Sequence, residues 1–295
     1  MGKQVLILHV GMPKTGSSAL QSMLYRNQDV LAQQGFKYGD IDGNTAMPKQ
    51  QYLKNELFQN RFIRTSDILG RVPKCGLILS CEGLTNHLYD FTSEALTEFR
   101  QLISGFNSKI FVVLRSPKDW ARSYYKQAVI NPSIKRVGFY ACAQTFSEFV
   151  QLPRIKQLMA HRTLLDDLRC GFGADSLITA DYHGDWLQVF SDLIGVSPEH
   201  WDGITQVNES PPDWLIEILR QVNVFDLSEP RRLAWKAVLQ GFAKTNHVTL
   251  RKAYKKQVAG NIELEREVLD SLVPSADDGF DLSPETLMDF LAFAR

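Results

Sequence analysis

The hydrophobic pattern of the chain alternates short apolar runs with longer stretches of helical spacing. Five runs have the length and composition of strands in a covered sheet. They are Val5–Leu8, Gly35–Tyr38, Leu77–Cys81, Lys109–Leu114 and Ser176–Ala180. Strands that alternate with helical segments indicate an α/β fold, in which about five mainly parallel strands form a doubly wound sheet of three layers.

Apolar residues at spacings of three and four predict helices after most of these strands. The expected helices begin near Ser17, cover residues 95–103 with Gly105 just beyond, begin at Pro117, and run from Trp186 to Gly195. From Pro211 onward the pattern is helical, with charged faces and no convincing strand.

With 295 residues, of which 44% are hydrophobic, the chain is long enough to bury a substantial core. We expect a single domain over residues 1–295, with an α/β core at about 3–195 and a helical part at about 211–295. Residues 40–75 and 131–170 show little periodicity, and we expect irregular or helical segments there.

The composition excludes several classes of protein. Thirty-three Lys and Arg residues balance thirty-three Asp and Glu residues, which argues against a broad nucleic-acid surface. The cysteines have neither CxxC spacing nor the density of a disulfide framework, so reduced thiols are expected. They are Cys75, Cys81, Cys142 and Cys170. No apolar run reaches the roughly 18 residues of a membrane span. The first apolar run is too short for a signal peptide, so we expect a cytoplasmic protein.

The segment between the first strand and the first helix has the features of an anion site. It reads His-Val-Gly-Met-Pro-Lys-Thr-Gly-Ser-Ser over residues 9–18. The first N–H groups of a helix have no internal partner, and the helix dipole places partial positive charge there. Gly11 and Gly16 allow a tight turn and close approach to a phosphate, and Lys14 adds a cation. Ser17 and Ser18 supply hydroxyl donors.

This loop differs from a Walker A sequence in one informative way. The pattern G-x-x-x-x-G-K-[ST] requires lysine directly after the second glycine. Gly11 and Gly16 have the required spacing, but Ser17 follows Gly16, and Lys14 stands two residues before it.

Polar residues follow three other predicted strands. Glu82 comes after the third strand, Arg115 after the fourth and Tyr182 shortly after the fifth. In a parallel sheet, ligands bind outside the carboxyl ends of the strands, where these residues and the loop are expected to meet. Arg115 can grip a phosphate with two hydrogen bonds, and Ser123, eight residues later, can add a hydroxyl.

Pro-Lys-Thr-Gly-Ser-Ser, together with Arg115-Ser-Pro and Ser123, resembles the sulfotransferases that use 3′-phosphoadenosine 5′-phosphosulfate (PAPS). The resemblance extends over about residues 3–195 and is closer to bacterial members. It implies a fold related to P-loop NTPases, with Arg115 and Ser123 on the 3′-phosphate. It also implies a loop that holds the phosphosulfate. The loop residues concerned are Pro13, Lys14, Thr15, Gly16, Ser17 and Ser18.

Other family features match less well. Tyr182 has the position of an adenine-contacting tyrosine, but Tyr-His-Gly stands where Tyr-Glu-Asp is usual, and a packed strand-end tyrosine is the alternative. The Arg-Lys-Gly element of animal cytosolic members has no match. The nearest basic cluster is Arg251, Lys252, Lys255 and Lys256, for which a solvated helix face is the better interpretation.

Sulfuryl transfer requires a general base and a cation at the leaving oxygen. Lys14 is the expected cation. Glu82 is the expected base, because a carboxylate stands where cytosolic members have a histidine; a structural role is its alternative, and His87 is the reserve. Asn208 and Ser210 are further candidates for the site without an assigned role.

The sequence therefore predicts a PAPS-dependent sulfotransferase that releases adenosine 3′,5′-bisphosphate and needs no metal. The acceptor is a hydroxyl or amine of an unidentified small molecule, carbohydrate or lipid. Two alternatives stay open: a P-loop phosphotransferase (kinase) with Glu82 as a metal-binding carboxylate, and a non-catalytic nucleotide-binding protein of the same fold. Oligomeric state has no signal in the sequence.

Overall fold

The structure is a computed structural model in which residues 2–39, 49–72, 76–134, 137–202, 211, 213–224 and 236 are described. The chain forms two compact units, one of residues 1–121 and 152–208 and one of residues 122–151 and 209–295. The boundary falls inside a single helix, and each unit is described separately below.

The first unit contains a sheet of five parallel strands in the order β2-β3-β1-β4-β5. The strands are β1 (Val5–His9), β2 (Phe36–Tyr38), β3 (Gly76–Ser80), β4 (Asn107–Leu114) and β5 (Ser176–Asp181). All five predicted strands are present, with ends shifted by one or two residues. β1 lies at the centre of the sheet. The chain leaves β1 toward β2 and leaves β4 toward β5, in opposite directions along the strand order, and this arrangement creates a ligand crevice between β1 and β4.

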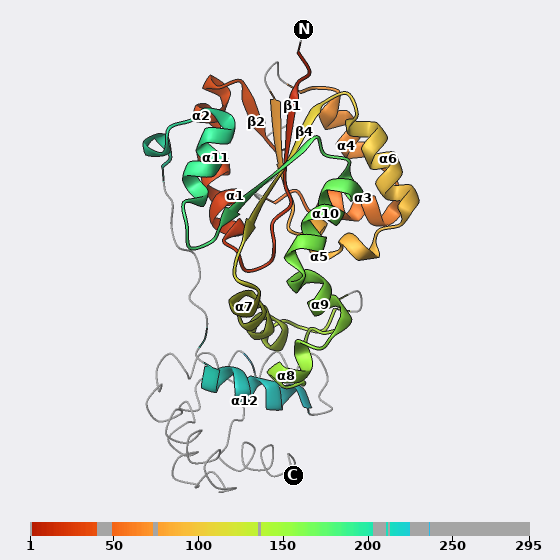
Figure 1. Cartoon of the computed structure of the whole chain (residues 1–295), viewed down its shortest axis with the longest axis vertical. Coiled ribbons are helices and arrows are strands. Elements are labelled where there is room, and N and C mark those ends of the chain that lie inside the picture. Colours follow the sequence, from red (N-terminus) through yellow and green to blue (C-terminus); the bar gives the residue numbers. More distant parts are fainter. Residues whose placement is uncertain are drawn as a thin grey trace, which may run out of the picture. The chain divides into compact units, whose positions relative to one another are not determined.

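Helices cover both faces of this sheet, so the predicted three-layer α/β architecture is confirmed (Figure 1). One face carries α1 (Ser17–Arg26), α2 (Gln28–Gln33) and α11 (Trp186–Ile194). The other carries α3 (Tyr52–Gln59), α4 (Ile63–Leu69), α6 (Ser93–Ile103) and α10 (His161–Phe172). Shorter elements complete the unit: α5 (Gly83–Asn86), η1 (Leu88–Asp90), α9 (Pro153–Met159) and η2 (Pro198–His200).

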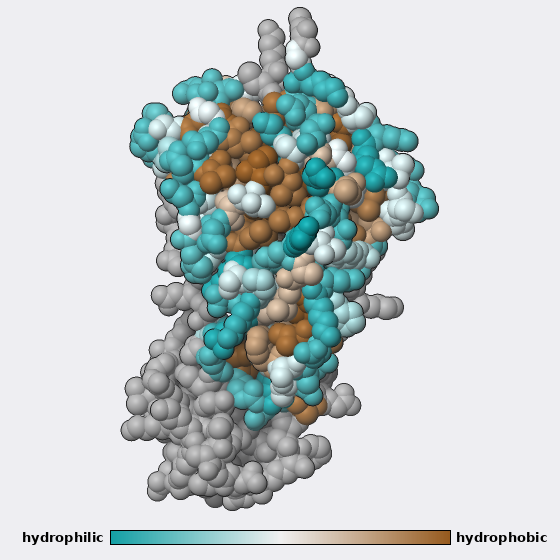
Figure 2. All heavy atoms as spheres, viewed as in Figure 1, coloured by the Kyte–Doolittle hydropathy of each residue, from teal (hydrophilic) through white to brown (hydrophobic). Residues whose placement is uncertain are grey.

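The apolar runs of the strands form the core because they are covered on both faces. Ile7, Ile78 and Phe111 pack with α1, α2 and α11, and all five residues of β3 are buried. β5 is an edge strand and buries only Ala180. Figure 2 shows apolar side chains on the viewed face around β5 and α11, where several residues of these elements are only partly buried.

The weakly periodic segment at 40–75 contains α3 and α4 in its described part. Glu56 of α3 is buried, and its carboxylate accepts hydrogen bonds from the backbone N–H groups of Arg64 and Thr65, in the first turn of α4. A side chain distant in sequence therefore satisfies the free N–H groups of that helix.

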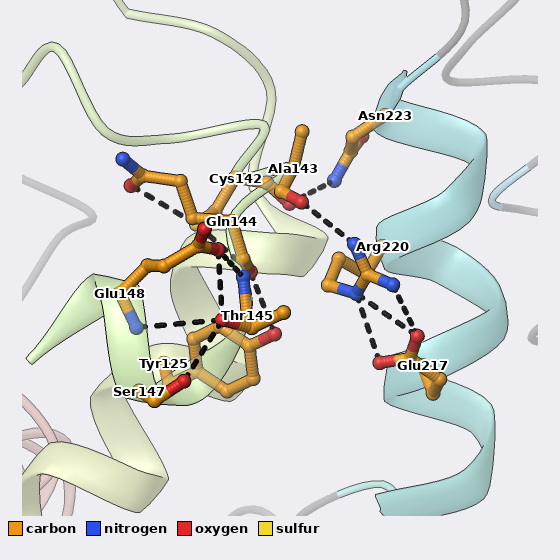
Figure 3. Close-up of polar contacts among 10 residues, drawn as sticks. All are labelled: Tyr125, Cys142, Ala143, Gln144, Thr145, Ser147, Glu148, Glu217, Arg220 and Asn223. Carbon is orange, nitrogen blue, oxygen red and sulfur yellow. Dashed lines mark hydrogen bonds and ion pairs between the residues drawn. The ribbon is translucent and has the colours of Figure 1, made fainter.

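The second unit is built around α7 (Pro117–Ile130), which begins in the first unit, and includes α8 (Phe146–Phe149) and α12 (Asp213–Val224). Arg220 of α12 donates to the carbonyl of Ala143, and Asn223 donates to that of Cys142 (Figure 3). The buried Lys236 donates to the carbonyl of Val129 at the end of α7. The carbonyl of Val129, in the last turn of α7, is thus satisfied by the side chains of Lys236 and Asn223.

Several predictions lie outside the described residues. These are Cys75, Asn208, Ser210, the basic cluster Arg251, Lys252, Lys255 and Lys256, and most of the helical part expected at 211–295. Cys81, Cys142 and Cys170 are free thiols. Among the described helices, none combines the length and apolar character needed to cross a membrane.

Candidate functional site

The loop between β1 and α1 has an unusual backbone. Three of its residues adopt positive φ angles: Gly11 at 46°, Lys14 at 66° and Gly16 at 80°. The left-handed region is costly for a residue with a side chain, so the backbone of Lys14 is strained, and contacts with the surrounding structure must hold it in this conformation. Gly16 is left-handed and is followed by the helical Ser17, and such a pair turns successive N–H groups toward one side, which is the geometry of an anion-binding nest.

Hydrogen bonds to the loop carbonyls hold this conformation. The hydroxyl of Thr15 donates to the carbonyl of Met12 at 2.7 Å, and the indole Nε1 of Trp120 donates to the carbonyl of Pro13 at 2.8 Å. Thr15 and Trp120 are both buried. The loop therefore presents its carbonyls to the protein.

The N–H groups on the other side of the loop remain available. No side chain caps α1 at Gly16. Within the described chain, the backbone N–H groups of Gly16, Ser17 and Ser18 donate to no other group. α1 is 10 residues long, so these N–H groups lie at the positive end of a full helix dipole.

Glu82 lies against the start of this loop. A Cβ added to Gly11 would stand 3.0 Å from Cγ of Glu82 and 2.7 Å from Oγ of Ser17, so the three residues are in contact. The hydroxyl of Ser17 donates to the carbonyl of Met12 at 3.4 Å and also favours the charged form of Glu82. Gly11 is thus required both by its positive φ and by lack of space.

Burial raises the pKa of the Glu82 carboxyl above its ordinary value. The charge of Lys49, the hydroxyl of Ser17 and the charge of Lys14 oppose this rise. A carboxylate whose pKa is raised by desolvation accepts a proton more readily than an exposed one, as a general base must.

Arg115 lies at the end of β4, beside the loop, and packs on Tyr182. Its guanidinium carbon is 5.0 Å from the centre of the Tyr182 ring, a cation–π arrangement. The Nε atom of Arg115 is buried without a hydrogen-bond partner, and the guanidinium forms no ion pair with any described residue. A partly buried cation without a counter-charge is costly, so this geometry favours an anionic ligand.

Tyr182 connects Arg115 to the loop. A Cβ at Gly16 would be 3.3 Å from Cε2 of Tyr182, so the ring edge touches this glycine. The N–H of Tyr182 donates to the carbonyl of Leu114 at 2.7 Å, which extends the pairing of β4 and β5. Tyr182 is therefore packed at the strand end, with one ring face toward Arg115.

The structure brings together Lys14 and its loop, Glu82, Arg115 and Tyr182, which come from the ends of four neighbouring strands. Ser123 belongs to the second unit, where it is buried on α7, and the candidate site consists of residues of the first unit alone.

The reserve candidate His87 has a different environment: its Nδ1 lies 2.9 Å from Asp90, which also pairs with Arg154. Burial lowers the pKa of His87, against the effect of Asp90.

Sequence reasoning missed a buried polar group beneath the loop. His9 ends β1, and its Nδ1 lies 2.6 Å from Oγ of Ser80 on β3, which also accepts from Gln21 of α1 at 2.8 Å. Burial lowers the pKa of His9 to about 3, so the ring is neutral. These contacts join β1, β3 and α1 directly below the anion site. The sequence feature that could have identified His9 is its position as a polar residue at the end of an apolar strand.

Trp120 is the second residue that the sequence analysis missed as part of the site. It was predictable only as an apolar helix residue, because its partner, the carbonyl of Pro13, is 107 residues away in the chain. Its hydrogen bond joins the helix that follows Arg115 to the loop that contains Lys14.

No group of three or more His, Cys, Asp or Glu side chains suited to a metal occurs in the described part of the chain. No family model matches the protein, and comparisons with curated proteins and with solved structures give no match.

Trp120→Phe should weaken anion binding by loosening the loop. Trp201→Phe is the matched control, because its indole also donates one buried hydrogen bond of 2.8 Å, to Ser191 within the same unit. Both variants should lower the free energy of unfolding by about 1–3 kcal/mol. Only Trp120→Phe should also lower the affinity for adenosine 3′,5′-bisphosphate, by roughly fivefold, or about 1 kcal/mol. Calorimetric titration measures this, and equal losses in both variants would contradict a positioning role.

Proposed function

We propose that the protein transfers a sulfuryl group from PAPS to a hydroxyl or amine of an acceptor. One observation carries the proposal: an open nest of N–H groups and Arg115, a cation with no ion-pair partner among the described residues, lie at neighbouring strand ends. The two features suit a ligand with two separate anionic groups. PAPS has such groups at its 5′ and 3′ positions.

The loop suits the 5′-phosphosulfate and Arg115 suits the 3′-phosphate. The N–H groups of Gly16, Ser17 and Ser18 are donors that need no reorganisation on binding. Arg115 can offer paired N–H groups to one phosphate. Tyr182, between the two, supports both Gly16 and Arg115 through packing, and contact with adenine stays a prediction for its exposed part.

The reaction requires an acceptor oxygen or nitrogen in line with the bond that breaks. The acceptor atom forms a bond to sulfur while the bond from sulfur to the bridging phosphate oxygen breaks. The electron pair of that bond stays on the phosphate oxygen, and the acceptor proton passes to Glu82. Lys14 stabilises the growing charge on the phosphate oxygen.

The contact between Glu82 and Ser17 keeps one alternative open, because a carboxylate and a hydroxyl at this place also suit the Mg²⁺ of a P-loop phosphotransferase. The position of Lys14, two residues before Gly16, and the unpaired Arg115 favour PAPS. A non-catalytic protein would bind the same nucleotide without turnover.

Adenosine 3′,5′-bisphosphate should bind at least about tenfold more tightly than adenosine 5′-monophosphate. A charge-assisted contact from Arg115 to the 3′-phosphate is worth roughly 1.5–3 kcal/mol. Arg115→Ala should remove most of the preference, whereas Arg162→Ala, at an exposed position of α10, should retain it. Calorimetric titration decides the point. Equal affinities in the wild type, or tighter binding of Mg–ATP, would overturn the proposal. The contribution of Ser123 to binding of the 3′-phosphate stays a prediction.

Removal of the Lys14 ammonium should mainly lower kcat, on the order of 10²-fold or more, because the charge that it stabilises grows in the transition state. Lys14→Gly and Lys14→Ala both remove the charge, but glycine accepts the positive φ of this position without strain. Similar losses of kcat in both variants would assign the effect to charge. A raised KM for PAPS with an unchanged kcat would show that Lys14 only binds the donor.

Glu82→Gln should lower turnover by about 10²-fold or more while bisphosphate binding and thermal stability stay near wild type. His87→Gln, which removes the reserve candidate, should retain activity. In the wild type, kcat/KM should fall as the pH drops through the pKa of Glu82, and the fall should begin above the ordinary carboxyl range because burial raises that pKa. Full activity of Glu82→Gln would exclude Glu82 as the base.

A further inference from the structure

Two lysines that the proposed reaction does not use lie beside Glu82, on the β3 side of the loop. Lys49 directly precedes Gln50, which is bound to the end of β3 twice. The N–H of Gln50 donates to the carbonyl of Ser80 at 3.0 Å, and its side-chain oxygen accepts from the N–H of Ser80 at 2.6 Å. Ser80 is two residues from Glu82, so these contacts hold Lys49 near the carboxylate.

Lys54 of α3 lies against Gly83, the residue after Glu82. A Cβ at Gly83 would be 2.6 Å from Cδ and 3.0 Å from Cβ of Lys54, so the lysine stem lies across the residue that follows Glu82. The charge of Lys54 also influences the buried thiol of Cys81 and the ring of His87. Lys54 therefore lies beside the segment from Cys81 to His87, which contains Glu82.

The charge of Lys49 acts on Glu82, and that of Lys54 acts on Cys81 and His87. The ammonium groups of the two lysines nevertheless form no hydrogen bond or ion pair with a described residue. The nearby carboxylate of Asp90 is already engaged by Arg154 and His87. Lys49 and Lys14 both lower the pKa of Glu82, and the effect of Lys49 is the larger.

The lysines are separated from the nucleotide side of the site. Arg115 and Tyr182 follow β4 and β5, whereas Lys49 and Lys54 lie along β3, on the opposite side of β1 in the strand order. A donor held by the loop and by Arg115 extends toward β4 and β5. The atom that receives the sulfuryl group must come within reach of Glu82.

We propose that the acceptor is itself an anion, a hydroxyl compound that carries a carboxylate, sulfate or phosphate group, and that Lys49 and Lys54 bind this group beside Glu82. The inference rests on the proposed function and names its acceptor class. Ammonium groups bind such anions as point charges, so the contact selects for charge more than for shape. A neutral acceptor would leave both ammonium groups without a direct anionic partner among the described residues.

The test compares acceptors that have the same hydroxyl groups and differ in charge, such as 4-nitrophenyl β-D-glucuronide with its amide, and 4-hydroxyphenylacetate with its amide. The wild type, Lys49→Gln, Lys54→Gln and the double variant are assayed with labelled PAPS. Lys3→Gln is the matched control, because Lys3 is exposed and precedes β1 at the other end of the sheet. Binding of each compound to the complex with adenosine 3′,5′-bisphosphate is measured in parallel.

The wild type and Lys3→Gln should prefer the anionic member of a pair by at least about tenfold in kcat/KM or in affinity. The preference should fall toward unity in the double variant. Lys49→Gln also removes a charge that keeps Glu82 ionised, so the ratio between acceptors, and not kcat alone, is the relevant measurement.

Three results would overturn the inference. These are no preference for the anionic compounds in either turnover or binding, a preference that survives in the double variant, and a loss of bisphosphate affinity in the lysine variants, which would place these lysines on the donor. All three leave the proposed function standing as long as the wild type prefers adenosine 3′,5′-bisphosphate to the monophosphate. If the wild type lacks that preference, the proposed function itself is contradicted.

Discussion

The site depends on the loop after β1, whose carbonyls are bound by the protein and whose N–H groups are left for a ligand. Lys14 in the left-handed region is strained, and the buried donors Thr15 and Trp120 hold the backbone in that state. A loop held in this way offers its donors without prior rearrangement, so little of the binding energy is spent on ordering it.

The sheet supplies the other groups through its strand order. Because β3, β1, β4 and β5 are neighbours and all parallel, the residues that follow them meet at one edge. Arg115 after β4 and the carboxylate Glu82 after β3 therefore lie on opposite sides of the Lys14 loop in the strand order. This separation suits a transfer reaction, in which donor and acceptor must approach one atom from different directions.

Charge is distributed unevenly across this edge although the whole chain is neutral. In the proposed reaction, Arg115 and Lys14 bind the donor, Lys49 and Lys54 bind the acceptor, and Glu82 is the carboxylate between them. Its burial and its surrounding cations have opposite effects on its pKa, so the basicity of Glu82 is a balance that a bound anion changes.

The sequence by itself determined the strands, the first turn of α1 and the residues at the strand ends, because apolar runs, glycine spacing and strand-to-helix transitions are local patterns. It identified Lys14, Glu82 and Arg115 as candidates, but not their neighbours. The contacts of Trp120 with Pro13, of Tyr182 with Gly16 and of Lys54 with Gly83 join residues far apart in the chain. Only tertiary packing decided them, since no local pattern records which distant side chain fills the space beside a glycine or satisfies a given carbonyl.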